Sequence, residues 1–172
     1  MIAPTLHTAR LTLRPLTFAD YPAYGAFMAS PRSAFIGGPF DTDGAWGAFC
    51  HDAGQWALFG HGGLMIDHTA TGETIGNVCI SHGPLFPEPE LGWFLYDRHE
   101  GQGYATEAAR ALRDWAFATA KLPTLVSYVD PANRASAAVA ERLGAVLDPH
   151  APRQPGPGNE ADLVYRHPRP AA

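Results

Sequence analysis

The string E-L-G-W-F-L-Y at residues 90–96, followed by D-R-H-E-G-Q-G at residues 97–103, decides the fold of this chain. The first segment has the aromatic and aliphatic content of a buried strand, and the second interrupts it with two glycines. Residues 104–117 then place small and apolar side chains on one stripe at helical spacing: Ala105, Ala108, Ala109, Leu112, Trp115 and Ala116. The stretch therefore predicts a strand, a glycine turn and a helix, which ends before Pro123.

The turn between this strand and this helix predicts an anion-binding site. The first N–H groups of a helix lack intrahelical partners, and Gly101 and Gly103 have no side chains to keep a ligand away from them. The helix dipole adds about half a positive charge at the same end, so a phosphate group is a natural occupant. A second interpretation stays open, in which the glycines merely supply unusual dihedral angles to a tight turn.

Two common phosphate-binding motifs do not fit this turn. A P-loop requires G-x-x-x-x-G-K-[ST], a string that the sequence lacks. A dinucleotide-binding fingerprint requires a third small residue where Thr106 stands, and it usually lies near the start of a βαβ unit. The turn instead lies past the middle of the chain, after segments with the pattern of hairpins.

The strand and turn together resemble another phosphate-binding element. E-L-G-W at residues 90–93 and G-Q-G-Y-A-T-E-A at residues 101–108 resemble the acetyl-CoA loop of the GCN5-related N-acetyltransferase (GNAT) family. They look closest to the subgroup that acetylates ribosomal-protein N-termini and small amines. In that family a Q/R-x-x-G-x-G/A loop wraps the pyrophosphate of coenzyme A, and residues 100–105 fill this register with Glu100 where Gln or Arg is usual. An alternative register from Arg98 restores the arginine but moves the glycines relative to the helix.

The resemblance extends to both ends of the chain. R-L-T-L-R-P-L at residues 10–16 resembles the start of the same subgroup, and Asn133-x-x-Ser136 with Arg142-Leu-Gly144 resembles the second family signature. It implies a mixed, mostly antiparallel α/β (α+β) sheet with two splayed parallel strands and flanking helices. It also implies a set of acetyl-CoA contacts: Leu95, Tyr96, Glu100, Gly101, Gln102, Gly103, Tyr104, Ala105, Thr106 and Asn133.

The resemblance also implies catalytic roles. Backbone amides in residues 94–96 would polarise the thioester carbonyl. Many family members protonate the leaving thiolate with a tyrosine on the Asn133 helix, but this chain has Ala140 there, so Ser136 becomes the substitute unless it only binds pantetheine. Glu90 is the expected proton acceptor, because a partly buried carboxylate can accept an ammonium proton directly or through water. The further candidates for that role are Glu88 and His82.

The function implied is transfer of an acetyl group from acetyl-CoA to a primary amine by direct attack in a ternary complex. Two other classes stay open: a catalytically silent acyl-CoA-binding or regulatory domain, and a structural module with a fortuitous glycine turn. The amine itself is not readable, since a protein N-terminus, an aminoglycoside, a polyamine and an amino acid all fit. The oligomeric state is open between monomer and homodimer.

Composition limits the remaining possibilities. The chain has 172 residues, which suits a single domain over residues 1–172, and its 46% hydrophobic and 17% charged content excludes a disordered chain. A net charge of −5 predicts no nucleic-acid partner and suits cationic amines. No metal site is expected, and Cys50 and Cys79 are predicted to be buried thiols rather than a disulfide. Because no signal peptide or long apolar run appears, the expectation is a cytoplasmic protein without membrane contact.

The rest of the chain predicts the following elements. Strands are expected at residues 6–16, 56–66, 73–82, 124–129 and 161–167, and the strand at 124–129 should run parallel to the one at 90–96. Helices are expected after the Thr17-Phe-Ala-Asp20 capping box to about Ser30, from an Asp41 cap through Ala53, and from Asn133 to Leu143. The middle helix should bury Trp46, Phe49 and Cys50, and Trp56 should also be a core residue. Loops are expected at residues 32–40, 83–88 and 148–160.

Overall fold

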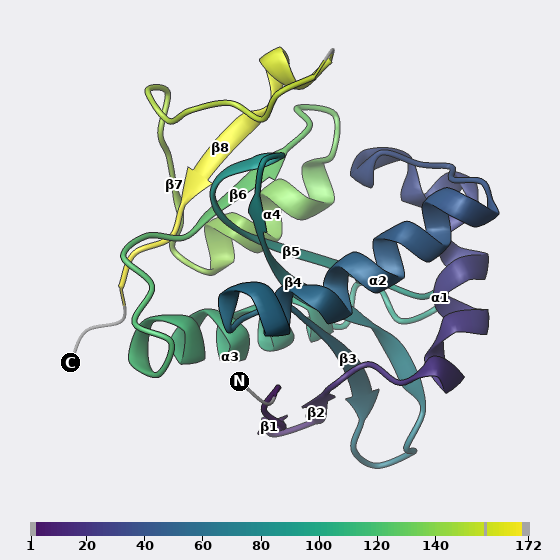
Figure 1. Cartoon of the computed structure of the whole chain (residues 1–172). Helices are drawn as coiled ribbons and strands as arrows, with labels where there is room; N and C mark the ends of the chain where they lie inside the picture. Colours follow the sequence, from purple (N-terminus) through teal and green to yellow (C-terminus); the bar gives the residue numbers. More distant parts are fainter. Residues whose placement is uncertain (1–2, 157, 170–172) are drawn as a thin grey trace.

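The computed structural model describes residues 3–156 and 158–169 of the chain (Figure 1). The described strands form one sheet in the order β1-β2-β3-β4-β5-β6-β8-β7. Their bounds are Leu6–His7 for β1, Leu11–Arg14 for β2, Gly63–His68 for β3, Thr74–Gly83 for β4, Phe86–Leu95 for β5, Val126–Val129 for β6, Val146–Leu147 for β7 and Leu163–Arg166 for β8. The α-helices are α1 at Tyr21–Met28, α2 at Thr42–Phe59, α3 at Tyr104–Ala118 and α4 at Arg134–Arg142. Within the described residues, 3-10 helices cover Phe18–Asp20, Pro31–Ile36 and Asn159–Ala161.

The sheet is antiparallel except between β5 and β6, which confirms the predicted fold class. These two strands are parallel because α3 carries the chain back across the sheet between them. Glu90 and Val126 are their one registered pair among the described residues, although β5 continues to Leu95. The two strands therefore splay apart beyond Glu90, and the last half of β5 is unpaired on that side.

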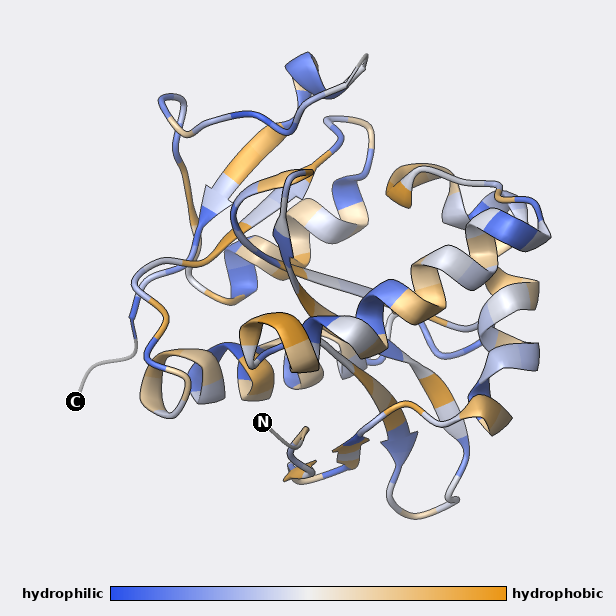
Figure 2. Cartoon of the chain, viewed as in Figure 1, coloured by the Kyte–Doolittle hydropathy of each residue, from blue (hydrophilic) through white to orange (hydrophobic). Residues whose placement is uncertain are grey.

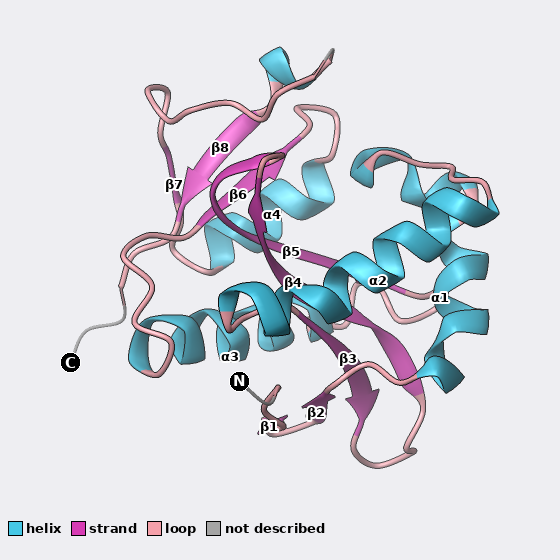
Figure 3. Ribbon diagram, in the orientation of Figure 1, coloured by secondary structure: helices cyan, strands magenta, loops and turns pink. Residues whose placement is uncertain are grey.

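Helices cover both faces of the sheet in three layers (Figure 3). Ala108, Ala109 and Leu112 of α3 pack on one face against strand residues such as Val78 and Leu91, with no exposed surface. On the other face, Tyr24 of α1 and Phe49 of α2 pack around Met65. Apolar residues accordingly line the central strands, while the end of the β3–β4 hairpin is hydrophilic (Figure 2). Burial of these two apolar faces is the main force that holds the layers together.

The predicted strand, turn and helix around residue 100 are present with small shifts of their bounds. The helix at residues 104–117 is α3, and its apolar stripe faces the sheet as its spacing indicates. β6, α4 and β8 also lie where the sequence predicts them, and Gly144 follows α4 with a left-handed φ of 79°. The capping box before α1 is present. The Asp20 carboxylate accepts hydrogen bonds from the backbone N–H of Thr17 at 2.7 Å and from its hydroxyl at 2.9 Å.

The predicted first strand at residues 6–16 is wrong, because the chain turns in its middle. β1 and β2 form a short hairpin in which Thr8 and Leu11 bond each other. Arg10 at this turn reaches α3, where its Nε donates to Glu107 at 2.7 Å. The alternation of apolar and polar residues alone predicts one continuous strand at residues 6–16. The contact of Arg10 with α3 instead holds a turn between β1 and β2.

The expected end of the second helix at Ala53 is also wrong. α2 continues to Phe59 and ends at Gly60, whose φ of 74° closes the helix in the left-handed region. The helix directs Ala45, Phe49, Asp52 and Trp56 toward the sheet at helical spacing. Trp46 and Cys50 lie about 100° around the helix from this stripe, so Trp46 is 43% exposed and Cys50 is exposed. The burial of Phe49, Trp56 and Cys79 is as predicted, but that of Trp46 and Cys50 is not.

Two expected loops contain regular structure. Residues 31–36 form a 3-10 helix whose first turn is capped by Ser30, which accepts a hydrogen bond from the Arg32 N–H at 3.3 Å. The loop at residues 83–88 shrinks to a tight turn, because β4 runs to Gly83 and β5 starts at Phe86. A register shift beside Ser81 adjusts the pairing there, which periodicity does not reveal. β7 was not predicted at all.

Candidate active site

Two neighbouring cavities meet where β5 and β6 splay apart. The first, which we call the loop cavity, has a volume of about 930 Å³ and is lined by the loop at residues 100–106 and by α4. The second, which we call the acid cavity, has a volume of about 570 Å³ and contains Asp52 and Glu90. The residues that line both are Phe35, Ile36, Trp93, Phe94, Asn133 and Ser136. A ligand in each cavity would therefore meet the other at the splay.

The loop cavity has an open helix terminus at one end. Gly103 is the N-cap of α3 with a φ of 82°, and no side chain caps the first N–H groups of this helix. Gly101 has a φ of 73°, and a Cβ placed on it would meet no described atom within 4 Å. The backbone amides at this turn are thus free to bind an anion, which is the arrangement that the sequence predicts.

Arg10 holds the turn from outside the cavity. Its Nη1 donates to the carbonyl of Gln102 at 3.0 Å, and its guanidinium lies 4.5 Å from the centre of the Tyr104 ring. Glu107 accepts from Arg10 and, at 2.6 Å, from the Thr8 hydroxyl, and these partners keep its pKa below the usual value despite some desolvation. The β1–β2 turn therefore fixes the glycine loop to the sheet.

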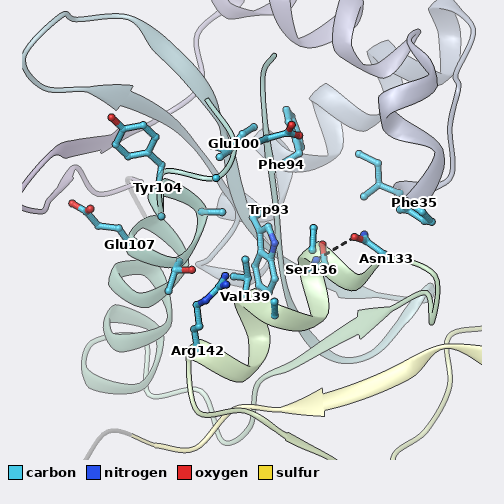
Figure 4. A pocket seen from close by; sticks show the side chains of 18 of the residues that line it. Phe35, Trp93, Phe94, Glu100, Tyr104, Glu107, Asn133, Ser136, Val139 and Arg142 are labelled. Atoms are coloured by element: carbon cyan, nitrogen blue, oxygen red, sulfur yellow. Dashed lines mark hydrogen bonds between the residues drawn. The ribbon is translucent and has the colours of Figure 1, made fainter. Parts of the chain in front are cut away.

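Most of the residues predicted to bind acetyl-CoA line the loop cavity (Figure 4). They are Leu95, Glu100, Gly101, Gly103, Tyr104, Ala105, Thr106 and Asn133. Two others lie elsewhere. Gln102 directs its side-chain amide to the Arg98 carbonyl, and the Tyr96 ring packs beside Phe27 and Phe94. The Tyr96 N–H also donates to the Ile75 carbonyl at 2.8 Å, so the sheet already uses it.

Three arginines line the loop cavity, and of these only Arg142 belongs to a signature in the sequence. Arg32 reaches across from its 3-10 helix, donates to the Leu95 carbonyl at 3.2 Å and forms an ion pair with Glu100. Arg110 and Arg142 lie on α3 and α4, and Arg110 donates to the Arg142 carbonyl at 3.3 Å. Arg32 lies more than sixty positions before the loop in a segment without a motif, so no sequence signal could have found it.

Asn133 and Ser136 stand at the junction of the two cavities (Figure 4). Asn133 is the N-cap of α4, and its Oδ1 accepts a hydrogen bond from the Ser136 N–H at 3.1 Å. The Ser136 hydroxyl is not part of this cap. Ala140, one turn further along the helix, is fully buried and carries no hydroxyl. The predicted pair is therefore brought together, with both side chains at the splay.

Glu90 lines the acid cavity at the last paired position before the splay. It lies opposite Ser81 on β4, and the backbone N–H of Tyr128 donates to its carboxylate. Burial, together with the charges of Asp162 and Asp52, raises the pKa of Glu90 to about 7. The predicted proton acceptor is thus half protonated near neutral pH and lies beside the junction.

Asp52 is a second carboxyl group in the acid cavity, and it belongs to none of the motifs in the sequence. Its carboxylate accepts hydrogen bonds from the Tyr24 hydroxyl at 3.0 Å and from the Cys79 thiol at 3.3 Å. Burial raises the pKa of Asp52 to about 6, although these donors oppose the shift. One signal could have found it, namely an aspartate on the apolar stripe of α2 between Phe49 and Trp56.

The other two candidates for the proton acceptor do not line either cavity. Glu88 forms a bidentate ion pair with Arg166 at 2.8 and 2.9 Å, and this partner lowers the pKa of its carboxyl. His82 is held by Gln55 through its backbone, and its ring lies 5.0 Å from that of Phe59. Both residues therefore have structural partners, which leaves Glu90 beside the junction.

Other site types lack support in the described part of the chain. No group of three or more His, Cys, Asp or Glu side chains within it could hold a metal ion. No helix among residues 3–156 and 158–169 is long and apolar enough to cross a membrane.

Known proteins share both the sequence and the fold. A crystal structure of an acetyltransferase from Agrobacterium tumefaciens strain C58 matches with a TM-score of 0.93 and 64% identity, covering 98% of this chain and 96% of that one. A structure from Vibrio cholerae, provisionally assigned as a ribosomal-protein-serine acetyltransferase, matches with a TM-score of 0.73 and 25% identity. The match covers 98% of this chain and 100% of that one. The uncharacterised protein YkkB of Bacillus subtilis is 44% identical over 82 residues, which is 46% of this chain and about half (48%) of that protein.

A family model described as an acetyltransferase (GNAT) domain matches residues 10–146, which is most of the chain. The matched segment includes β5, the glycine loop, α3 and α4, and therefore every wall of the loop cavity that the sequence predicts. The splayed sheet and the uncapped glycine loop agree with this match. The chain therefore belongs to the GNAT acetyltransferase family.

Proposed function

We propose that this protein transfers an acetyl group from acetyl-CoA to a primary amine by direct attack in a ternary complex. The observation that carries the proposal is the meeting of two cavities at the splay, one with an uncapped helix N-terminus and one with a carboxyl group of raised pKa. An anionic donor and a cationic acceptor can then bind from different cavities and react at the junction.

Residues of the loop cavity fit coenzyme A. The amides of residues 101–106 would bind its pyrophosphate, because they are uncapped and no side chain at Gly101 or Gly103 blocks them. Arg110 and Arg142 add positive charge beside the loop. Glu100 stands where the family pattern has Gln or Arg, but its ion pair with Arg32 offsets the repulsion that a free carboxylate would exert on a phosphate. Asn133 and Ser136 would then contact the pantetheine arm.

The thioester carbonyl would be polarised by an amide of β5. Successive N–H groups of a strand point to opposite sides, and the Tyr96 N–H points to β4. The Leu95 N–H therefore faces the splay, as does the Leu95 carbonyl that Arg32 contacts. Of the three residues at 94–96, we propose Leu95 alone as the donor to the developing oxyanion.

The chemistry requires one proton acceptor and one leaving thiol. The amine nitrogen forms a bond to the acetyl carbon, the carbon–sulfur bond breaks, and the electron pair leaves with sulfur. Glu90 accepts the proton that the ammonium group loses, directly or through water. After the attack the nitrogen loses its second proton, which reaches the thiolate through water or through the Ser136 hydroxyl, and this hydroxyl regains the proton that it gives. The thiolate hardly requires an acid, since a free thiol has a pKa of about 8.5.

The structural likeness at 25% identity supports placement in the ribosomal-protein acetyltransferase-like subgroup, though not a particular acceptor. A second candidate function is a catalytically silent acyl-CoA-binding domain, which Ala140 favours because no tyrosine hydroxyl stands there. Release of free thiol from acetyl-CoA with a panel of amines, read beside calorimetry of CoA binding, separates the two. Turnover with at least one amine is expected, whereas tight CoA binding without turnover across the panel would overturn the proposed function.

A further inference from the structure

The acid cavity carries charge of one sign. Four carboxylates line it, those of Asp52, Glu90, Asp130 and Asp162, while none of its described lining residues is Lys or Arg. Arg153 approaches only from outside the lining, where it contacts the Asp162 backbone carbonyl. A volume of about 570 Å³ is large enough for a small organic molecule. The cavity therefore selects against anions and suits a small cation.

Asp52 is buried without a cationic partner. It is 7% exposed, and the donors on its carboxylate are the Tyr24 hydroxyl, the Cys79 thiol and the Asn77 side-chain amide, none of which brings a positive charge. Removing a carboxylate from water is costly unless a cation compensates it. A ligand ammonium or guanidinium group at this position would supply that compensation.

Asn77 is a second buried polar group with unused capacity beside Asp52. Its side chain is 2% exposed and lines the same cavity. Its amide nitrogen contacts the Met65 sulfur at 3.9 Å, and no donor from the described residues reaches its amide oxygen. A ligand N–H group would therefore satisfy Asn77 and Asp52 together.

The position of Asp52 differs from that of Glu90. Asp52 extends from α2 over Cys79 on β4, whereas Glu90 lies on β5 at the splay. Aromatic residues that line the same cavity, including Phe40, Phe86 and Tyr128, can cover the apolar part of a ligand and the face of a cation. The cavity thus offers two separate acidic positions along one apolar wall, and only one of them is at the reaction junction.

We propose that the acceptor is a small amine with a second cationic group, which Asp52 and Asn77 bind while the reacting amine lies at Glu90. This inference rests on the proposed function and specifies its substrate class. A protein N-terminus presents one ammonium group and a long polar chain, so it would leave Asp52 uncompensated.

The test compares two acceptors of equal chain length, putrescine and butylamine, which differ in the second ammonium group. Wild-type kcat/KM is expected to be at least about tenfold higher for putrescine. Asp52→Asn is expected to reduce this preference by about 10- to 100-fold. The matched control is Asp43→Asn, which removes an equal charge from an exposed position on the same helix and should keep the preference.

Several outcomes would overturn the inference while leaving acetyl transfer intact: equal use of both amines, an unchanged preference in a folded Asp52→Asn protein, or better use of an alanine-initiated peptide than of either. Failure of thiol release with every acceptor would instead remove the proposed function. Circular dichroism checks that each variant folds. If Asp52→Asn does not fold, Asn77→Leu tests the same position, and its preference for putrescine is expected to fall as well.

Discussion

At Glu90, two opposing effects set the protonation state. Burial and the neighbouring carboxylates Asp162 and Asp52 disfavour the charged form, while the Tyr128 N–H favours it, and the balance raises the pKa to about 7. A general base is most effective when its pKa lies near the working pH, because it is then both deprotonated and basic. The same residue would be a poor base if it were fully exposed to water, since its pKa would then lie near the ordinary carboxyl value.

Glu90→Gln should lower kcat by about 100-fold and leave CoA affinity unchanged, because the loop cavity is intact. Wild-type kcat should rise with pH through about 7 as Glu90 loses its proton. The kcat of the variant should not rise with pH through about 7. The difference in kcat between wild type and the variant should then shrink at high pH, where more of the amine arrives deprotonated. A pH–rate profile measured at saturating amine checks this, and a profile with the wild-type shape and height would show that another group accepts the proton.

Ser136→Ala tests the leaving-group side of the reaction. The N-cap of α4 uses the Ser136 backbone N–H, so removing the hydroxyl should leave the helix intact. We expect a rate loss between a few-fold and about 100-fold, with little change in CoA affinity, if the hydroxyl protonates the thiolate. Weaker CoA binding with an intact single-turnover rate would assign it to pantetheine binding instead. If neither quantity changed, Ser136 would be only a part of the helix.

At the scale of elements, the glycine loop before α3 supports a prediction with a close internal control. Gly103→Val should abolish measurable CoA binding in calorimetry, because a β-branched residue is strained at a φ of 82° and covers the helix amides. Gly60→Val places the same residue at a φ of 74° at the C-terminal end of α2, and Gly60 lines neither cavity. The control should lose similar stability but keep CoA affinity. Equal CoA affinities in both folded variants would contradict the assignment of the loop.

The elements also show what the sequence could and could not predict. α3 is recognisable because a glycine turn precedes it and its apolar stripe is regular, so both its bounds and its proposed role as an anion site follow from local pattern. α2 is not, because Gly54 lies inside it and its end depends on Gly60 alone. Asp52 becomes part of the site only through the position of α2 over β4, and Arg32 only through the folding of its 3-10 helix toward Glu100. Such contacts between distant segments leave no local periodicity.

At the scale of the whole molecule, the sheet separates two electrostatic environments that meet at one point. Three arginines line the loop cavity, and its two carboxylates, Glu100 and Glu107, are each paired with an arginine. The acid cavity has carboxylates and no described Lys or Arg. Attraction of an anionic donor to one side and a cationic acceptor to the other would raise both association rates and disfavour binding in the wrong cavity. The splay of β5 and β6 then provides the passage between them.

This arrangement has a cost for the free protein, which Asp52→Asn should reveal as a stability difference that depends on pH. The folded-state pKa of Asp52 is about 6 against an ordinary value of 3.8, so between these pH values the folded state binds more protons than the unfolded state. The contribution of Asp52 to the stability of the folded state is therefore greatest below pH 3.8 and is lost as the pH rises through 6. Asn does not titrate, so the variant does not lose this stability. The free energy of unfolding of the variant minus that of wild type should therefore rise by up to about 3 kcal/mol between pH 3.8 and about 6, and stay constant above that. Urea unfolding of both proteins at several pH values measures the difference, in which the opposing contributions of Asp20 and Glu107 cancel. If this difference does not change with pH, Asp52 is solvated or already compensated. A saturating cationic acceptor should make the difference less dependent on pH only if it pairs with this carboxylate.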